Sequence, residues 1–113
     1  PPGQPDRWVV LEKNGGVKTF RTGARQASDV TDLLTFPAGT INPDNEGGLL
    51  GMAFHPRWPA EPEAYFSYTT FSSTSPANMR SVVARYRSTN GGATLAPTAD
   101  SLLELDQPYA NHD

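Results

Sequence analysis

The fold of this 113-residue chain is decided by residues 46–56, which read EGGLLGMAFHP. Glycine tolerates backbone conformations that other residues avoid, so the pair Gly47-Gly48 predicts a turn. The apolar run from Leu49 to His55 follows directly. A short apolar run bounded by turn residues is typical of a strand buried on both faces. We therefore expect a glycine-rich loop that leads into an inner strand of a sheet.

The segments on either side of this stretch also predict strands. Upstream, turn residues 13–16 separate two β-rich segments and predict a hairpin. Residues 29–36 predict either a third strand or a short helix, because the spacing of their apolar residues suits both. Residues 37–48 are rich in Pro, Gly, Asn and Asp and predict a loop. The predicted strands comprise residues 7–12, 17–21, 29–36, 49–55, 64–71, 80–87 and 102–105.

The order of these strands predicts an all-β fold that is part of a β-propeller. Four successive antiparallel strands between two loops are typical of one propeller blade. Residues 7–36 would form part of a first blade and residues 49–105 a second, with residues 1–6 as a linker. A β-sandwich built from the same meander remains an alternative. Two blades alone would expose large apolar faces, so we expect residues 1–113 to be an incomplete domain of a longer protein.

Composition excludes several classes of function. The net charge is −3 and no basic block occurs, which argues against electrostatic binding of nucleic acid. The chain has no cysteine, so it can form neither a disulfide nor a thiolate zinc site. Its apolar runs are too short to span a bilayer as helices. The sequence shows no export leader, and it leaves the compartment and the oligomeric state open.

Two side chains are candidates for chemistry, and both lie in loops next to predicted strands. His112 follows the last strand, and a histidine with a pKa near 6.5 can act as a base near neutral pH. Glu46 precedes the strand that begins at Leu49. In a propeller these two loops would both lead from an outer strand to the next inner strand, which would place Glu46 and His112 over one pocket. In a sandwich this convergence would disappear.

Each candidate also has a purely structural interpretation. His112 would then be a solvated loop residue, and Glu46 a turn carboxylate that accepts hydrogen bonds from the glycine N–H groups. We expect Gly47 and Gly48 to serve backbone conformation rather than phosphate binding, because no Gly-Lys-Ser/Thr follows them. His55 is expected to hydrogen-bond a turn.

Several larger groups of residues are expected to be structural. A metal at residues 44–46 is disfavoured, because the twelve-residue calcium loop pattern is missing. The aromatic residues Trp58, Tyr65, Phe66 and Tyr68 are expected in the core, and the arginines Arg80, Arg85 and Arg87 on a solvated strand face.

The motif at 46–56 resembles that of the glucose/sorbosone dehydrogenases. It is followed in the same order by Tyr65-Phe66-Ser67-Tyr68, then Val83-Ala84-Arg85-Tyr86, and finally Leu102-Leu103-Glu104-Leu105 and Asn111-His112. The likeness covers roughly residues 7–113 and is most specific at 46–56. The glucose/sorbosone dehydrogenases resemble the soluble pyrroloquinoline-quinone-dependent aldose sugar dehydrogenases, whose domain is a six-bladed propeller. The resemblance therefore implies that this chain forms about two of six blades.

The resemblance also implies a reaction and roles for particular residues. His112 would be the catalytic base that takes the proton of the sugar's anomeric hydroxyl, while hydride passes to the quinone. Glu46 and Asn111 would line the substrate pocket. The ligands of pyrroloquinoline quinone and of calcium would lie outside this chain, which alone would be inactive. The resemblance further implies a periplasmic or secreted protein with a small-molecule sugar as substrate. The rival hypothesis is a non-catalytic β-propeller module that binds a protein or a carbohydrate.

Overall fold

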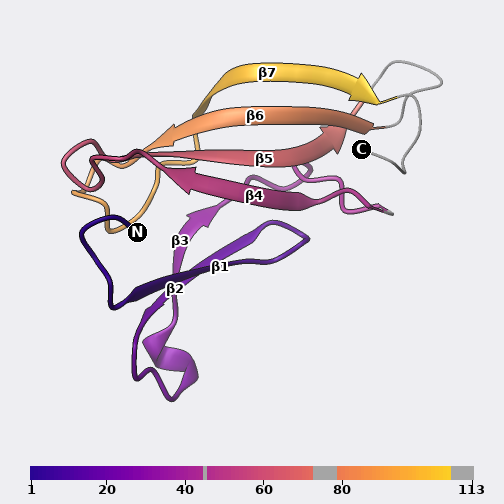
Figure 1. The fold of residues 1–113 in the computed structure, drawn as a ribbon. Coiled ribbons are helices and arrows are strands. Elements are labelled where there is room, and N and C mark those ends of the chain that lie inside the picture. The colour runs from indigo at the N-terminus through magenta and orange to yellow at the C-terminus, as the bar shows by residue number, and fades with distance from the viewer. Residues whose placement is uncertain (45, 73–78, 108–113) are drawn as a thin grey trace.

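The computed structural model describes residues 1–44, 46–72 and 79–107 and shows an all-β molecule with two antiparallel sheets (Figure 1). The first sheet has the order β1-β2-β3 and the second the order β4-β5-β6-β7. The strands of the two sheets are β1 (Arg7–Leu11), β2 (Gly16–Arg21), β3 (Thr31–Thr35), β4 (Leu49–Phe54), β5 (Glu63–Phe71), β6 (Met79–Arg87) and β7 (Ala99–Gln107). The predicted order of three strands, a long loop and four strands is confirmed.

The first sheet begins with the predicted hairpin. Arg7 pairs with Arg21 and Leu11 with Val17, and the turn between the strands contains Gly15 at φ 114°. Such a positive φ favours glycine, which is the turn chemistry the sequence predicts. The ambiguous segment that follows is mostly strand. A 3-10 turn (Ala27–Asp29) comes first, and β3 begins two residues after it.

The second sheet is a four-stranded meander whose last strand is longer than predicted. Phe71 pairs with Met79, and Met79 pairs in turn with Gln107. The polar residues at both ends of β7 do not end the strand, because arginines on β6 bind them. Arg85 donates a hydrogen bond to Asp100, and Arg80 donates one to Asp106.

The prediction that Leu49–His55 is buried on both faces is wrong for the described structure. Leu49 is buried, but Leu50 is 50% exposed and Ala53 is exposed as well. β4 is an edge strand of its sheet, and its register shifts between Leu49 and Gly51, where Leu50 is the extra residue. Among the described residues, packing therefore covers one face of β4 and leaves the other accessible to solvent.

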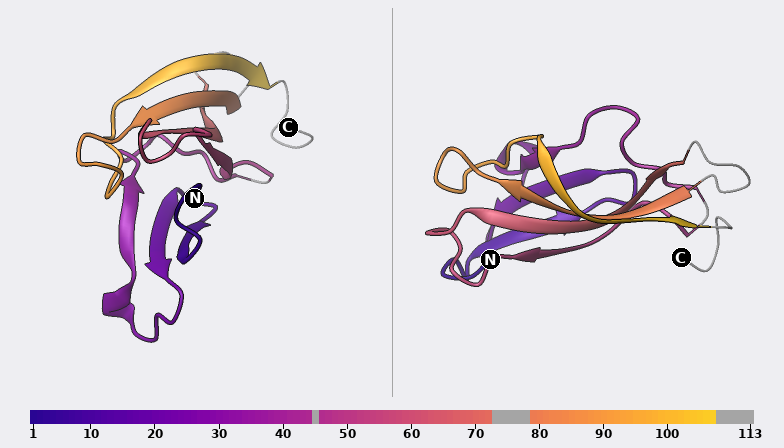
Figure 2. Two further views of the ribbon diagram at one scale, coloured as in Figure 1. Left: turned by 60° about the vertical axis from the view of Figure 1, so that its left-hand side comes forward. Right: turned by 90° about the horizontal axis from the view of Figure 1, so that it is seen from above.

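The hydrophobic core lies where the two sheets meet. Figure 2 shows the first sheet standing steeply against one face of the second. Phe36 follows β3 and makes edge-to-face contacts with Phe66, Tyr68 and Tyr86, at centroid distances of 5.8, 5.3 and 5.4 Å. This geometry is favoured between aromatic rings. Trp58, Phe66 and Tyr68 are buried as predicted, whereas Tyr65 is only half-buried.

The molecule is elongated, with extents of 45 × 29 × 22 Å, and exposes apolar side chains. The radius of gyration is 14.9 Å, whereas about 13 Å is typical of a compact domain of this length. On β7, Leu103 and Leu105 are 61% and 59% exposed. The two sheets are consistent with a partial β-propeller. No helix within the described residues is long and apolar enough to cross a membrane.

Candidate functional site

The start of β4 and the end of β7, which adjoin the two segments that the sequence singles out, lie at the same end of the second sheet. β4 begins at this end, where Leu49 pairs with Tyr68 on β5. β7 ends here too, because Gln107 pairs with Met79 and Met79 pairs with Phe71. In Figure 1 the tail of β4 and the arrowhead of β7 lie toward the same side of the molecule. We call this region the β4–β7 end.

A buried threonine fixes the loop that precedes β4. The Thr69 side chain on β5 donates a hydrogen bond to the Asn42 carbonyl (2.6 Å) and accepts one from the Gly48 N–H (2.7 Å). Backbone bonds between Asn42 N and Thr69 O, and between Thr69 N and Gly48 O, flank this bridge. Residues 42 and 48 are therefore both hydrogen-bonded to Thr69 on β5. These bonds fix the two ends of the turn that carries Glu46.

The two glycines of the motif are required by close packing. A Cβ at Gly47 would lie 2.5 Å from Met79 Cε and 2.6 Å from Thr69 Oγ1. Gly48 has φ 129°, and a Cβ there would lie 2.5 Å from the Lys13 carbonyl oxygen. Gly48 serves backbone conformation, as predicted, whereas Gly47 allows close packing. Together they place the Glu46 turn against β5 and the β1–β2 turn.

The predicted site residues are only partly within the described structure. Glu46 is exposed and lies at the β4–β7 end. Asn111 and His112 lie outside the described residues, so their positions stay predictions. His55 has the structural role expected of it, since its Nδ1 accepts a hydrogen bond from the Arg57 N–H (3.0 Å).

A polar cluster at the same end was missed by the sequence analysis. Asp106 Oδ1, on β7, accepts hydrogen bonds from Ser72 Oγ (2.8 Å) and from Arg80 Nε (2.9 Å). The hydrogen bond to Asp106 is the main cause that raises the pKa of Arg80, so this guanidinium stays charged. The sequence predicts only a solvated face for Arg80. An Arg-Asp cross-strand pair becomes visible only when the register is known.

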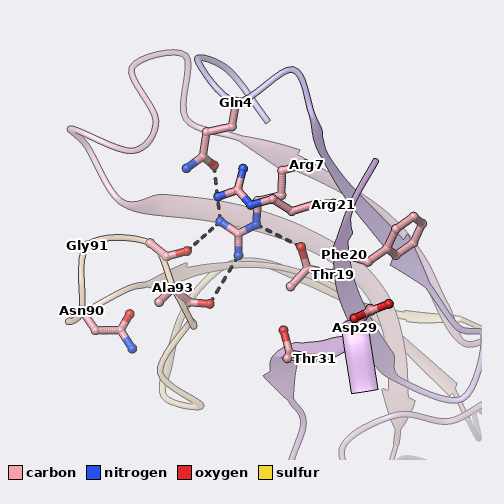
Figure 3. Close-up of a pocket in the computed structure, with 11 residues that line it drawn as sticks. Gln4, Arg7, Thr19, Phe20, Arg21, Asp29, Thr31, Asn90, Gly91 and Ala93 are labelled. Atoms are coloured by element: carbon pink, nitrogen blue, oxygen red, sulfur yellow. Dashed lines mark hydrogen bonds between the residues drawn. The ribbon is translucent and has the colours of Figure 1, made fainter. Parts of the chain in front are cut away.

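The opposite end of the second sheet has a cavity of ≈ 390 Å³ beside Arg7 (Figure 3). Arg7 donates to Thr19 Oγ1 (2.9 Å), to the Gln4 side chain (3.3 Å) and to the carbonyls of Gly92 (2.9 Å) and Ala93 (3.3 Å). Burial, and then the nearby charge of Arg21, lower the pKa of Arg7. Its neutral acceptors lie on β2, in the N-terminal segment and in the turn between β6 and β7, so Arg7 connects the first sheet to the second.

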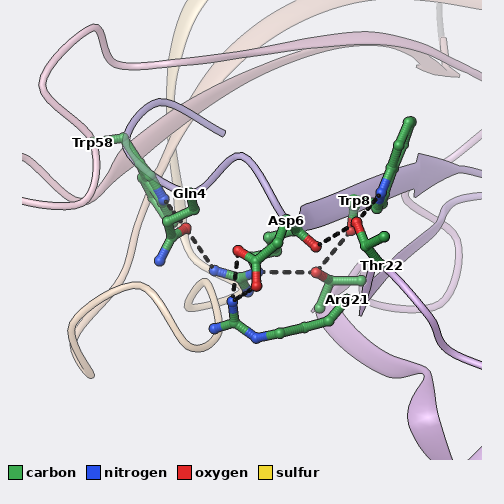
Figure 4. A network of polar contacts seen from close by, with 8 residues as sticks. Gln4, Asp6, Trp8, Arg21, Thr22 and Trp58 are labelled. Atoms are coloured by element: carbon green, nitrogen blue, oxygen red, sulfur yellow. Dashed lines mark hydrogen bonds and ion pairs between the residues drawn. The ribbon is translucent and has the colours of Figure 1, made fainter.

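Residues 1–6, predicted as a linker, take part in a polar network beside this cavity (Figure 4). The Gln4 side chain also accepts a hydrogen bond from Trp58 Nε1 (3.1 Å). Asp6 pairs with Arg21 at 2.9 Å, and this contact holds the pKa of Asp6 below its usual range. The network explains how the N-terminal segment is held against β2 and against the turn that contains Trp58.

The described residues do not form a metal centre by themselves. Within residues 1–44, 46–72 and 79–107, no three His, Asp or Glu side chains gather closely enough to hold an ion. Calcium needs six to eight oxygen ligands. The described residues at the β4–β7 end therefore do not complete a calcium site.

Comparisons with known proteins identify the family to which this chain belongs. A family model described as glucose/sorbosone dehydrogenase matches residues 3–108. A crystal structure from Thermus thermophilus, of a protein described as a candidate oxidoreductase (glucose dehydrogenase), is similar with a TM-score of 0.59 and 26% identity. The match covers 88% of this chain and 25% of that protein, so this chain spans a quarter of its length. The motif, the two sheets and the family match lead to one conclusion, which is that the chain belongs to the glucose/sorbosone dehydrogenase family.

Proposed function

We propose that this chain contributes the base and part of the substrate pocket to a sugar oxidoreductase. The protein would oxidise the anomeric carbon of an aldose. The hydroxyl proton would pass to the His112 imidazole, and the hydride to an electron acceptor. By family resemblance the acceptor is pyrroloquinoline quinone, assisted by calcium, and other parts of the enzyme would hold both. Glu46 and Asn111 would contact the sugar, and we propose that the protein is exported to the periplasm or secreted.

The observation that carries this proposal is the shared end of β4 and β7. The loop with Glu46 leads into β4, and the chain beyond Gln107 leaves β7 at the same end of the sheet. The two strands are opposite edges of a four-stranded sheet, so they lie about 14 Å apart at usual strand spacings. An extended chain from residue 107 to residue 112 reaches about 17 Å. The imidazole of His112 is therefore within reach of a pocket that includes Glu46.

The chemistry suits a histidine base. Oxidation of a sugar hydroxyl requires removal of the O–H proton as the hydride leaves carbon, so a nearby neutral imidazole lowers the barrier. The quinone supplies the electron sink, and the protein supplies orientation and proton transfer. Only the proton step is assigned to residues of this chain.

The direct test is activity of the full-length protein reconstituted with pyrroloquinoline quinone and calcium. Reduction of a dye by aldoses would be measured for the parent and for His112→Ala. We expect the variant to lose roughly 100-fold or more in kcat, which is the usual contribution of a general base. His55→Gln is the matched control, because it replaces the chain's other histidine with a residue that can still accept the Arg57 hydrogen bond.

Two results would overturn the proposal. One is the absence of dye reduction with every aldose despite bound cofactor, which would favour the binding-module hypothesis. The other is full activity of His112→Ala. The proposed compartment is tested separately, by fractionating cells that express the full-length gene and locating the protein with an antibody.

A further inference from the structure

We propose that Asp106 is a positioning residue for the base at His112. The inference rests on the proposed function, because it assigns to Asp106 the task of holding the end of β7 from which the chain continues to the base. Asp106 itself need not contact the sugar. Its role would be to fix the direction in which the chain leaves the sheet.

The geometry shows that one carboxylate oxygen ties three segments together. Asp106 Oδ1 on β7 accepts from Arg80 Nε on β6 and from Ser72 Oγ, which follows β5 directly. The side chains of both Asp106 and Arg80 are 34% exposed, so water competes only partly for this contact. Arg80 also lies 3.5 Å from Glu104, two residues earlier on the same strand as Asp106.

The contact lies at the end of β7 from which the chain continues toward His112. β7 is an edge strand, so backbone hydrogen bonds hold it on one side only among the described residues. The ends of such strands open most easily. Asp106 and Gln107 are its last two residues, and only Pro108 to Asn111 lie between them and His112. A displacement of about 1 Å in a reacting group can cost on the order of 100-fold in rate.

A second pair on the same two strands provides a matched control. Arg85 Nη2 on β6 donates to Asp100 Oδ2 on β7 at 3.0 Å. The strands and the residue types are the same, but this pair lies at the opposite end of β7. Losing it removes an Arg-Asp pair from the same two strands without disturbing the exit toward His112. Asp100 is 71% exposed against 34% for Asp106, so the melting temperatures of the two variants show how far their effects on the sheet differ.

The experiment compares Asp106→Ala with Asp100→Ala in the full-length, cofactor-loaded protein. We expect Asp106→Ala to lower kcat roughly 10-fold to 100-fold with little change in KM, because a displaced base weakens only the transition state. Asp100→Ala should keep kcat within about twofold of the parent, since it leaves the exit of β7 intact. Asp106→Asn retains the Oδ1 acceptor and should recover most of the lost kcat. Melting temperatures report the purely structural effect of each change.

A variant at His112 separates this inference from the proposed function. If Asp106 acts through the base, then Asp106→Ala should not reduce the residual rate of His112→Ala any further. Full activity of His112→Ala would refute the proposed function itself. A His112→Ala that is inactive, together with equal kcat values for Asp106→Ala and Asp100→Ala, would refute only the positioning role. If Asp106→Ala does not fold, Ser72→Ala replaces it, and an unchanged kcat in that variant would also refute the role.

Discussion

At the scale of single residues, the hydroxyl of Thr69 determines the geometry of the candidate site. It is fully buried and bridges a carbonyl and an N–H group that both belong to the loop before β4. The side chain therefore connects the interior of the second sheet directly to the turn that carries Glu46. Burying a hydroxyl that makes both hydrogen bonds costs little free energy. Removing it would leave a buried N–H and a buried carbonyl without this partner, which costs much more.

Thr69→Val should be destabilising although its shape is nearly unchanged. The substitution leaves the Gly48 N–H and the Asn42 carbonyl without this partner, so we expect the free energy of unfolding to fall by about 1–3 kcal/mol. Urea denaturation of the full-length protein measures the change. Thr69→Ser keeps the hydroxyl and should lose clearly less. A Thr69→Val protein as stable as the parent would show that these hydrogen bonds contribute little.

Tyr86 makes the free energy of unfolding depend on pH in the alkaline range. Burial, followed by a hydrogen bond with Tyr68, raises its pKa above the usual value, which is about 10 in an unfolded chain. The folded state therefore holds this proton more tightly. The stabilisation is complete below about pH 10 and is lost as the pH rises further. Tyr86→Phe cannot ionise, so its unfolding free energy should fall less steeply above pH 10. An identical slope in both proteins would contradict this assignment.

At the scale of elements, the point where the loop becomes β4 depends on a backbone that only glycine adopts easily. Gly48→Ala should lower the free energy of unfolding by about 1–3 kcal/mol, because its φ is positive and its Cβ would meet the Lys13 carbonyl. Gly51→Ala is the control, because Gly51 lies within β4 and a Cβ there would have no atom within 4 Å. The difference between their chemical denaturation midpoints is the measurement. A Gly48→Ala protein as stable as Gly51→Ala would mean that the turn relaxes freely.

The elements also show what sequence patterns can and cannot predict. Strands such as β2 and β5 follow from alternation and β propensity, and the hairpin follows from the turn residues 13–16. The exposure of Leu50 could not be predicted, because it depends on a register shift and on which strand forms the edge. The Asp106 cluster was missed for a similar reason: cross-strand partners distant in sequence have no local signal. The motif alone predicted that Glu46 lies in the loop before β4. The roles of Glu46, Asn111 and His112 stay predictions.

At the scale of the whole molecule, a hydrophobic core joins the two sheets, and the charged side chain of Arg7 also connects them. Arg7 binds acceptors on β2, in the N-terminal segment and in the turn between β6 and β7. The planar guanidinium reaches these groups simultaneously, which a lysine ammonium cannot do. The relative orientation of the sheets should therefore depend on Arg7 more than on the exposed ion pairs.

Arg7→Ala should loosen the junction between the sheets. We expect the free energy of unfolding to fall by about 2 kcal/mol, because hydrogen bonds from a charged donor are lost. Arg21→Ala breaks an ion pair in which both side chains are more than half exposed, and it should cause a much smaller loss. Equilibrium denaturation of the full-length protein compares the two. A larger loss in Arg21→Ala would assign the junction to the Asp6 network instead.

The contact between Lys13 and the beginning of β4 limits how this family member can evolve. The Lys13 carbonyl accepts a hydrogen bond from the Leu49 N–H (2.8 Å), although it belongs to the turn of the first hairpin. Hairpin turns ordinarily tolerate insertions and deletions. Here an added or lost residue would shift the carbonyl on which Leu49 depends and, with it, the acidic turn next to β4. We therefore expect the length of this turn to vary little among proteins that retain the Gly-Gly-Leu-Leu sequence.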